Sequence, residues 1–394
     1  MDVAIVGAGF AGMSAALFLA RAGHRVTLYE RAAEPGPVGA AIVLQPSGLA
    51  VLRALGVDAR VEARSARLDR LHVTTAKGRT IVDLRYATID PAWYGLGVAR
   101  GVLFEALWDA LAPAGVRMLA GREVDSLVPI ADRHELAFTD GARAGPHELV
   151  IAADGARSRT AAGIRGRSVH PYRWGALFHV GAFPDTAELN QVGDGARRFM
   201  GVLPMGAGRA SLFWSLRADR LDAWRAGFAA WREEAMRLDP RAASIIEGIG
   251  APEQVLFAPY FDVRMKRPYA DRGPPLVAIG DAAHATSPQL GQGSNLALID
   301  ALALAACLGE HATLAAALRA YHARRRRHLA YYQRATRWLT PLFQSDSRAL
   351  GWLRDLFMPL AMRLPPTRRL MTSSMAGVAA GFFGRREPLP APWP

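Results

Sequence analysis

Apolar and polar positions along the first thirty residues follow an order that predicts a strand, a helix and a second strand. Residues 2–6 form a short apolar run, and glycines follow at Gly7, Gly9 and Gly12. A longer apolar segment comes next, and residues 26–30 return to a short apolar run that ends in an acid. Short apolar runs bounded by turn residues indicate buried strands, whereas the longer segment has the length of a helix. The pattern therefore predicts a β-α-β unit.

The glycine spacing and the acid suit a nucleotide pyrophosphate. Gly7 permits the tight turn, Gly9 lets the backbone approach the phosphates, and Gly12 lets the helix pack close to the strand. The helix N-terminus, with its free N–H groups and partial positive charge, points at the anion. Glu30 ends the second strand, where a carboxylate can accept hydrogen bonds from ribose hydroxyls. A phosphate on that ribose would repel Glu30, so the site favours FAD or NAD over NADP.

Two later strands also end in residues that bear chemistry. Residues 148–152 form a buried strand followed by Asp-Gly at 154–155, and residues 276–279 form another that leads into Gly-Asp at 280–281. A glycine-rich loop at 291–295 then opens an apolar helix, whose N-terminus offers positive potential. A carboxylate for sugar-like hydroxyls beside a positive helix end fits a flavin, because the reduced flavin is negative at its N1 and O2 edge.

The patterning changes to strict alternation after residue 163. Residues 174–183, 197–203 and 210–216 alternate apolar and polar positions with aromatic residues among them, which indicates an antiparallel sheet. We therefore predict an α/β fold in which a Rossmann-type FAD-binding domain carries an inserted antiparallel-sheet substrate domain and a C-terminal helical region. The expected division is an FAD-binding domain at 1–165 and 270–340, a substrate domain at 166–269, and C-terminal helices and a tail at 341–394.

The charge of the chain is strongly positive and unevenly spread. The formal net charge of its 394 residues is +13, and residues 319–370 hold twelve Arg against two Asp. Such a surplus suits nucleic acid, an anionic membrane surface or a solvated face. Because neither aromatic interleaving nor a nucleic-acid-binding signature accompanies it, we expect no nucleic-acid partner. Residues 348–364 are amphipathic, so peripheral membrane contact stays open, whereas Asp300 interrupts the longest apolar run and no transmembrane segment is expected.

Cys307 is the single cysteine of the chain. An intrachain disulfide needs two cysteines, so we expect a reducing, cytoplasmic location. The disulfide reductases that share this type of N-terminal fold need a redox-active cysteine pair, and this chain lacks one. The first strand begins at residue 2, so we expect no signal peptide.

With its three motifs in this order, the chain resembles the single-component (class A) FAD-dependent aromatic monooxygenases of the para-hydroxybenzoate hydroxylase type over residues 2–340. The resemblance implies that Arg100 reaches the pyrophosphate or ribityl group, that the Val124 backbone holds the adenine, and that Asp281 binds the ribityl chain. It also implies that Asp154 and Gly155 serve both FAD and the reducing dinucleotide, because no second GxGxxG follows. The implied flavin-binding residues are Gly7, Gly9, Ala11, Gly12, Glu30, Arg31, Arg100, Val124, Asp154, Gly155, Asp281, Pro288, Gly291, Gly293, Ser294 and Asn295.

The reaction implied by the resemblance is a monooxygenation. NADH or NADPH reduces FAD, O2 adds to the flavin, and the flavin hydroperoxide transfers one oxygen atom to an aromatic or polycyclic, mostly hydrophobic substrate. His179, Met200 and Trp214 are candidates for the substrate pocket, although aromatic residues at strand spacing also occur as ordinary core. We name no catalytic side chain and no metal ligand, and we expect a monomer or a homodimer.

Three other functions compete with this interpretation. A flavin-dependent halogenase would carry a Trp-x-Trp-x-Ile-Pro stretch, which this sequence lacks. An FAD-dependent reductase of a prenyl-type substrate would share the fold but reduce a double bond. A non-enzymatic flavin redox sensor would bind FAD without turnover, and the absence of interaction repeats counts against it.

Overall fold

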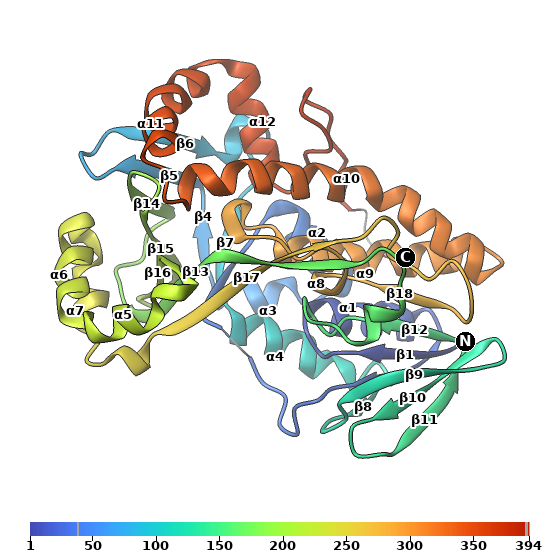
Figure 1. Ribbon diagram of the computed structural model, residues 1–394. Coiled ribbons are helices and arrows are strands. Elements are labelled where there is room, and N and C mark those ends of the chain that lie inside the picture. The colour runs from blue at the N-terminus through green and yellow to red at the C-terminus, as the bar shows by residue number, and fades with distance from the viewer. Residues whose placement is uncertain (38, 391–392, 394) are drawn as a thin grey trace.

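The computed structural model describes residues 1–37, 39–390 and 393, and its first layer is a five-stranded parallel sheet (Figure 1). The strand order is β18-β12-β1-β2-β8. Every residue of the neighbouring β12 and β18 is buried, as expected for a parallel sheet covered by helices on both faces. The strands are β1 (Asp2–Val6), β2 (Arg25–Tyr29), β8 (Arg117–Leu119), β12 (Leu149–Ala152) and β18 (Leu276–Ala278).

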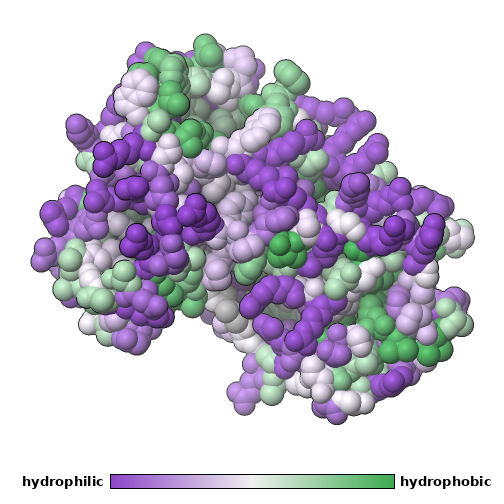
Figure 2. Space-filling view, in the orientation of Figure 1, coloured by the Kyte–Doolittle hydropathy of each residue, from purple (hydrophilic) through white to green (hydrophobic). Residues whose placement is uncertain are grey.

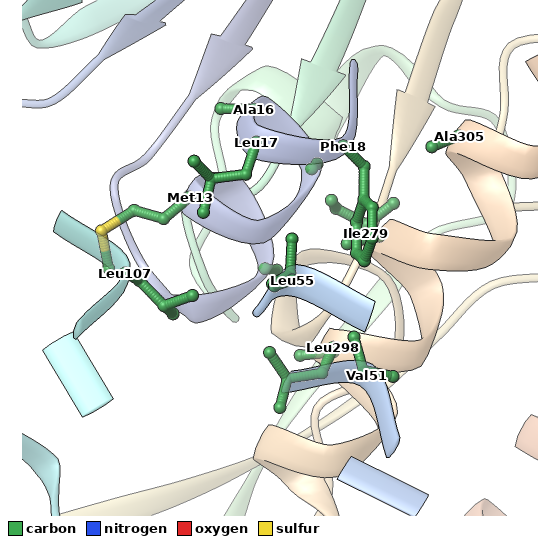
Figure 3. Packing of buried hydrophobic residues seen from close by; sticks show 14 of the residues in the cluster. Met13, Ala16, Leu17, Phe18, Val51, Leu55, Leu107, Ile279, Leu298 and Ala305 are labelled. Atoms are coloured by element: carbon green, nitrogen blue, oxygen red, sulfur yellow. The ribbon is translucent and has the colours of Figure 1, made fainter. Parts of the chain in front are cut away.

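Helices with apolar residues on all sides fill the core beside this sheet. Helix α1 (Phe10–Arg21) packs against α4 (Arg100–Leu111) and against α9 (Gly293–Glu310). Figure 3 shows Met13 of α1 beside Leu107 of α4, within one buried cluster. A helix that is apolar all round is stable only when it is surrounded, which is why α1 sits in the interior. Two shorter helices, α2 (Pro46–Leu55) and α3 (Asp58–Glu62), complete this layer.

A seven-stranded sheet forms the second domain. Its order is β17-β13-β16-β15-β14-β5-β6, antiparallel except where β14 pairs in parallel with β5. Helices α5 (Leu221–Ala226), α6 (Phe228–Leu238) and α7 (Ala243–Glu247) cover one face. The strands are β5 (Arg70–Thr75), β6 (Thr80–Arg85), β13 (Ser168–Ala182), β14 (Glu188–Asp194), β15 (Arg198–Gly206), β16 (Arg209–Arg217) and β17 (Leu256–Arg264).

Two small antiparallel sheets and a one-turn helix attach to the first domain. One sheet has the order β11-β10-β9 and the other the order β3-β7-β4. The helix is α8 (Asp281–His284). The strands are β3 (Ala41–Leu44), β4 (Ala66–Leu68), β7 (Gly95–Ala99), β9 (Val124–Ile130), β10 (Arg133–Phe138) and β11 (Arg143–His147).

The C-terminal region begins with α10 (Leu314–Phe343), which crosses the molecule below α11 (Arg348–Arg363) and α12 (Pro365–Met375) in Figure 1. Helices α11 and α12 follow and pack over β6. The fold class predicted from the sequence is confirmed. The division at 165, 270 and 340 stays a proposal, with two adjustments: hairpin β5–β6 joins the substrate sheet, and residue 340 lies inside α10. Sequence alone could not show which sheet edge the hairpin would meet.

Helix α9 bears on the expectation that the chain has no transmembrane segment, which stays a prediction. By length and hydropathy this helix could cross a membrane, although the sequence pattern led us to expect no such segment. Its spanning window is 61% buried inside the protein, and Asp300 within it is ion-paired with Arg325 of α10. Helix α9 is thus the central helix of a core, and its apolar composition reflects contact with α1, α2 and α10.

Candidate functional site

The three motifs meet at one edge of the parallel sheet. Strands β18, β12 and β1 are neighbours, and parallel strands present their carboxyl ends at the same edge. Gly7 after β1 touches the chain after β12, since a Cβ on Gly7 would lie 2.6 Å from the Ala153 carbonyl oxygen. Gly280 after β18 touches α1, since a Cβ there would lie 2.9 Å from Ala11 Cβ. Side chains are excluded at these points because three backbones converge.

The glycine loop leaves an open helix end. A Cβ on Gly12 would overlap the Gly7 carbonyl oxygen, whereas a Cβ on Gly9 would meet no atom within 4 Å. Helix α1 begins at Phe10 with no side-chain cap and no acidic residue in its first turn. Free N–H groups beside open space, with no carboxylate competing, can accept a phosphate. Gly7 and Gly12 thus allow neighbouring backbone segments to pack closely, and Gly9 leaves space for a ligand to approach the backbone.

Arg100 is a half-buried cation beside this helix end. Its guanidinium lies 4.9 Å from the centre of the Phe10 ring, and a Cβ on Gly39 would lie 2.8 Å from its Cδ. The buried Nε has no hydrogen-bond partner within the described part of the chain. Burial lowers the pKa of Arg100, and the Asp281 carboxylate partly opposes that shift. A buried guanidinium with a free donor next to an open helix end fits the FAD pyrophosphate.

Glu30 and Val124 lie together at the end of β2. The Glu30 carboxylate accepts hydrogen bonds from the Ala8 N–H at 2.8 Å and from the Ala32 N–H at 3.0 Å. The Arg122 N–H donates to the Glu30 carbonyl at 2.7 Å, which brings the start of β9 at Val124 beside the glycine loop. Glu30 is therefore fixed where a ribose can reach it, and Arg31 next to it is exposed.

The loop before α9 is built by Asn295. This residue is fully buried, donates to the Val43 and Gly291 carbonyls at 3.0 Å each, and accepts from the Gln45 N–H at 2.8 Å. Its amide thus ties β3 to the glycine loop. The remaining predicted flavin-binding positions of this region are accessible to solvent. Asp281, Pro288 and Gly293 are exposed, and Gly291 and Ser294 are partly exposed.

Asp154 holds its own turn. Its carboxylate accepts from the Ser158 hydroxyl and, at 3.0 Å, from the Thr160 hydroxyl, so its oxygens are already engaged. Gly155 has φ +83° and open space at the Cβ position. We therefore propose that the Asp154 side chain shapes this turn and that the backbone around Gly155 is the part that contacts a ligand. Sequence reasoning missed Arg167, which bridges this turn to α8 by donating to Ala156 O at 2.6 Å and Ala282 O at 3.0 Å.

A buried polar chain runs from the Gly-Asp motif into α10. Asp300 accepts from the Gly280 N–H at 3.0 Å, from His284 Nε2, and from Arg325 Nε at 2.7 Å. Arg325 Nη1 lies 2.8 Å from His328 Nδ1, and His328 Nε2 lies 2.9 Å from the Gly377 carbonyl. Burial raises the pKa of Asp300, but His284 and Arg325 together hold it well below its usual range. Asp300, a carboxylate in the middle of an apolar helix, was the sequence feature that could have revealed this chain of buried polar side chains.

The C-terminal segment reaches the same loop. Gln292 Nε2 donates to the Ser374 carbonyl at 3.1 Å and to the Met375 carbonyl at 2.7 Å, and the Ser47 N–H donates to Ala376 O at 3.2 Å. Gly377 has φ +82°, and a Cβ there would overlap Ser47 Oγ. Residues 372–379 therefore pack against the loop at the start of α9, a contact that no local pattern in the sequence predicts.

The structure does not bring the three substrate candidates to this site. Met200 and Trp214 pair across β15 and β16 and belong to the cluster under α5–α7, where the Trp214 and Trp231 rings are 6.1 Å apart. His179 is directed to the Gln254 carbonyl at 2.9 Å on the same side. The sequence correctly predicted a strand at residues 210–216 whose side chains alternate between two faces. The three candidates, however, lie on the face that helices α5–α7 cover.

The opposite face of the sheet is the one tied to the flavin loop. Ser215 Oγ accepts from Gln344 Nε2 at 2.8 Å, and Gln344 Oε1 accepts from Gln289 Nε2 at 2.9 Å. Gln289 directly follows Pro288 in the loop that leads to Gly291. Phe213 shares this face with Ser215 because side chains two residues apart on a strand point the same way. Phe213 packs against Phe199 with ring centres 5.7 Å apart.

A family model described as the FAD binding domain matches residues 1–336. This chain belongs to that family. A FAD-dependent urate hydroxylase from Klebsiella pneumoniae subsp. pneumoniae is 29% identical over 351 residues, covering 82% of this chain and 86% of that protein. A 3-amino-4-hydroxybenzoate 2-monooxygenase from Streptomyces cremeus is 30% identical over 329 residues, covering 78% of each chain. The resemblance to the single-component FAD-dependent aromatic monooxygenases is confirmed, and FAD is the cofactor.

Solved structures of this monooxygenase family have the same fold. PqsL from Pseudomonas aeruginosa, described as a probable FAD-dependent monooxygenase, superposes with a TM-score of 0.78 at 25% identity and covers 90% of this chain and 99% of its own. A variant of Klebsiella pneumoniae HpxO complexed with FAD superposes with a TM-score of 0.81 at 23% identity, covering 95% and 99% of the two chains. The fold of this monooxygenase therefore accommodates FAD, in agreement with the open helix end and the free guanidinium of Arg100.

Proposed function

We propose that this monooxygenase uses NADH or NADPH and O2 to insert one oxygen atom into a small aromatic or polycyclic, mostly hydrophobic substrate. The observation that supports the proposal most directly is the link from Ser215 through Gln344 to Gln289. It connects the face of the sheet that carries Phe213 to the loop that opens α9, while Phe199 on the same face packs against Phe213 and against Phe343 of α10. An apolar wall beside a flavin loop, with a few amide and hydroxyl groups, suits a ring with a polar substituent.

Bound FAD supplies the redox and oxygen chemistry, and the protein supplies binding, orientation and electrostatics. The N-terminus of α1 and Arg100 would hold the pyrophosphate, and Glu30 would select an unphosphorylated ribose. Asp281 would accept hydrogen bonds from ribityl hydroxyls. The uncapped N-terminus of α9, fixed by Asn295, stabilises negative charge on the reduced ring system. Residues 372–379 keep water out from below that loop, because they are buried against it.

The reductant shares the FAD cleft in this proposal. The sequence has no second glycine motif of the GxGxxG type followed by an acid, so a separate dinucleotide domain is not expected. Arg157 and Arg159 follow the turn at Gly155 and offer positive charge to either nicotinamide dinucleotide, although Arg159 is also ion-paired with Glu123 and Asp125. A monomer or homodimer in the cytoplasm fits a chain whose one cysteine is buried.

The visible spectrum of the purified protein tests this function. Flavin absorbance is recorded anaerobically before and after NADH or NADPH, with and without a panel of small aromatic compounds, and then after air is admitted. Bleaching by one dinucleotide, acceleration by an aromatic compound and recovery in air are the expected results. The reaction is then repeated under oxygen-18 gas, and the labelled product is sought by mass spectrometry.

Two outcomes would contradict the proposal. Flavin that no nicotinamide reduces, with any compound of the panel, would favour a reductase or a redox sensor that takes electrons from another donor. Recovery of flavin absorbance that is coupled to saturation of a double bond, without O2 uptake, would favour the prenyl-type reductase. The relatives described above are named as hydroxylases and monooxygenases, which favours oxygen insertion over both.

A further inference from the structure

Helix α11 turns its apolar face away from the protein. Trp352, Phe357, Leu360 and Leu364 are 63%, 56%, 47% and 58% exposed. On α11, Leu353, Phe357 and Leu360 are four and three residues apart and so lie on one side of the helix, with Trp352 at the edge of that side. Leu364 directly follows the end of the helix. Figure 2 shows hydrophobic residues among polar ones over α11 at the top left of the molecule. A surface helix usually buries such a stripe, so α11 is inverted relative to the common arrangement.

The inner face of α11 fixes this orientation. A Cβ on Gly351 would lie 2.7 Å from the Ala196 backbone nitrogen, so the helix is in close contact there. Arg354 is buried, donates to the Leu342 carbonyl at 3.2 Å, pairs with Asp355 at 2.6 Å, and lies 5.0 Å from the centre of the Phe343 ring. Rotating α11 to bury its apolar face would expose the Gly351 contact and break the Arg354 contacts with Leu342 and Phe343 of α10.

Unpaired positive charge surrounds the apolar face. Arg348, Arg363, Arg368 and Arg369 are exposed, and in the described part of the chain none of them has a carboxylate within 4.0 Å. Arg348 begins α11, Arg363 ends it, and the other two lie on α12. An apolar stripe with aromatic residues and arginines at its borders is typical of helices that lie in the plane of a membrane surface.

A pocket continues this surface at the start of α12. It has a volume of about 520 Å³ and is lined by Pro365, Leu370 and Phe382, with Arg369 and Arg386 at its sides. Phe383 at its rim is fully exposed. The lining of the pocket begins at Pro365, which directly follows Leu364 in the chain. Its apolar walls and two guanidinium groups suit an acyl chain beside a phosphate.

We propose that α11 and the start of α12 dock on an anionic phospholipid surface. Trp352, Phe357, Leu360 and Leu364 enter the boundary between headgroups and acyl chains, and the four arginines contact phosphate groups. Charge decides against a second copy of this chain as the occupant. A symmetric pair through this face would bring the same unpaired arginines together, whereas anionic lipid neutralises them. Docking would deliver the enzyme to hydrophobic ring compounds that partition into membranes, which goes beyond the proposed reaction.

Vesicle binding tests the proposal with the FAD-loaded protein. Sedimentation is measured with vesicles of phosphatidylcholine alone and of phosphatidylcholine with phosphatidylglycerol, at low and high salt. We expect binding to the anionic vesicles that weakens in high salt, and at least about tenfold weaker binding for a W352S/F357S variant. The matched control is Ile130→Ser on β9, another exposed apolar residue, which we expect to leave binding unchanged. Both variants alter exposed side chains, so flavin content is expected to stay the same.

Three results would overturn the proposal. Equal binding to neutral and anionic vesicles would remove the role of the arginines, and absence of binding to either would remove the docking surface altogether. A dimer in light scattering that becomes monomeric in W352S/F357S, without any change in vesicle binding, would identify the face as an interface between copies of this chain. An R348Q/R363Q variant separates charge from apolar contact, because it should lose the preference for anionic vesicles while the apolar face is intact.

Discussion

The Asp300→Asn substitution should weaken both folding and FAD binding. Asp300 is fully buried, and N–H donors from Gly280, His284 and Arg325 converge on its two oxygens. An asparagine amide presents a carbonyl on one side only, so its NH2 group faces at least one of these donors. The substitution also leaves the buried Arg325 guanidinium without its counter-charge.

The expected loss follows from the burial of the pair. Removing one partner of a buried ion pair costs about 3–5 kcal/mol, because the remaining charge stays desolvated. A domain is typically stable by only about 5–15 kcal/mol, so the apo protein should lose a large part of its free energy of unfolding. The Gly280 N–H is one of the groups released, and Gly280 positions Asp281. We therefore expect FAD affinity to fall by at least about tenfold, equivalent to roughly 1.4 kcal/mol.

Two measurements check this prediction. Urea unfolding of the apo protein, followed by circular dichroism, gives the change in the free energy of unfolding. Quenching of flavin fluorescence gives the dissociation constant for FAD. Asp239→Asn is the matched control, because Asp239 is also buried and paired with Arg241 but lies in the substrate domain. It should lower stability somewhat and leave the FAD dissociation constant unchanged.

The double variant D300L/R325M separates an unpaired charge from lost packing. Replacing both charges removes the desolvated guanidinium, so the double variant should be more stable than Asp300→Asn alone. The reasoning is refuted if Asp300→Asn lowers the free energy of unfolding by less than about 1 kcal/mol and leaves FAD affinity unchanged, since a buried pair of this kind cannot be lost at so small a cost.

Further predictions concern the cofactor, pH and the sheet. Arg100→Met should weaken FAD binding by about ten- to a hundredfold with little loss of apo stability, because its Nε has no hydrogen-bond partner among the residues that the structure describes; an unchanged dissociation constant would argue against pyrophosphate contact. Burial and Arg325 lower the pKa of His328 to about 3. The unfolded chain binds this proton near pH 6.5, so stability should fall as pH drops from about 6.5 to about 3, and His328→Gln should flatten that slope in urea titrations across pH. Trp214→Ala should cost about 3–5 kcal/mol of stability, whereas Phe213→Ala should mainly raise the KM for the aromatic substrate; the opposite assignment would mean that the substrate lies under α5–α7.

The predicted glycine loop agrees with the structure because its constraints are local. A strand, a tight turn and a helix within twelve residues leave few backbone paths, and glycine at Gly7 and Gly12 is required wherever those backbones touch. Glu30 follows from the length of the β-α-β unit. Asn295 was predicted from the family resemblance, and its contact with the flavin stays a prediction, since its amide is engaged with backbone groups of Val43, Gln45 and Gly291.

The face of the substrate sheet could not be predicted in the same way. Alternation along residues 210–216 shows that Trp214 and Phe213 point in opposite directions, but not which side the helices α5–α7 will cover. Large aromatic residues are as frequent in a core as in a pocket, so Met200 and Trp214 were chosen on size alone. The packing of Trp214 against Trp231 is a contact between distant segments, and only the assembled fold reveals it.

The sequence by itself determined the nucleotide-binding unit, the order of the three motifs and the two-domain plan, because these depend on neighbouring residues and on strand and helix periodicity. Tertiary structure alone decided that hairpin β5–β6 joins the substrate sheet, that Asp300 connects Gly280 to Arg325, and that α11 faces outward. Each of these depends on which surfaces meet when elements far apart in the chain pack together. Burial of α9 makes its Asp300 carboxylate the anchor of a polar chain, whereas α11 keeps its apolar stripe in solvent because Arg354 and Gly351 hold its other side.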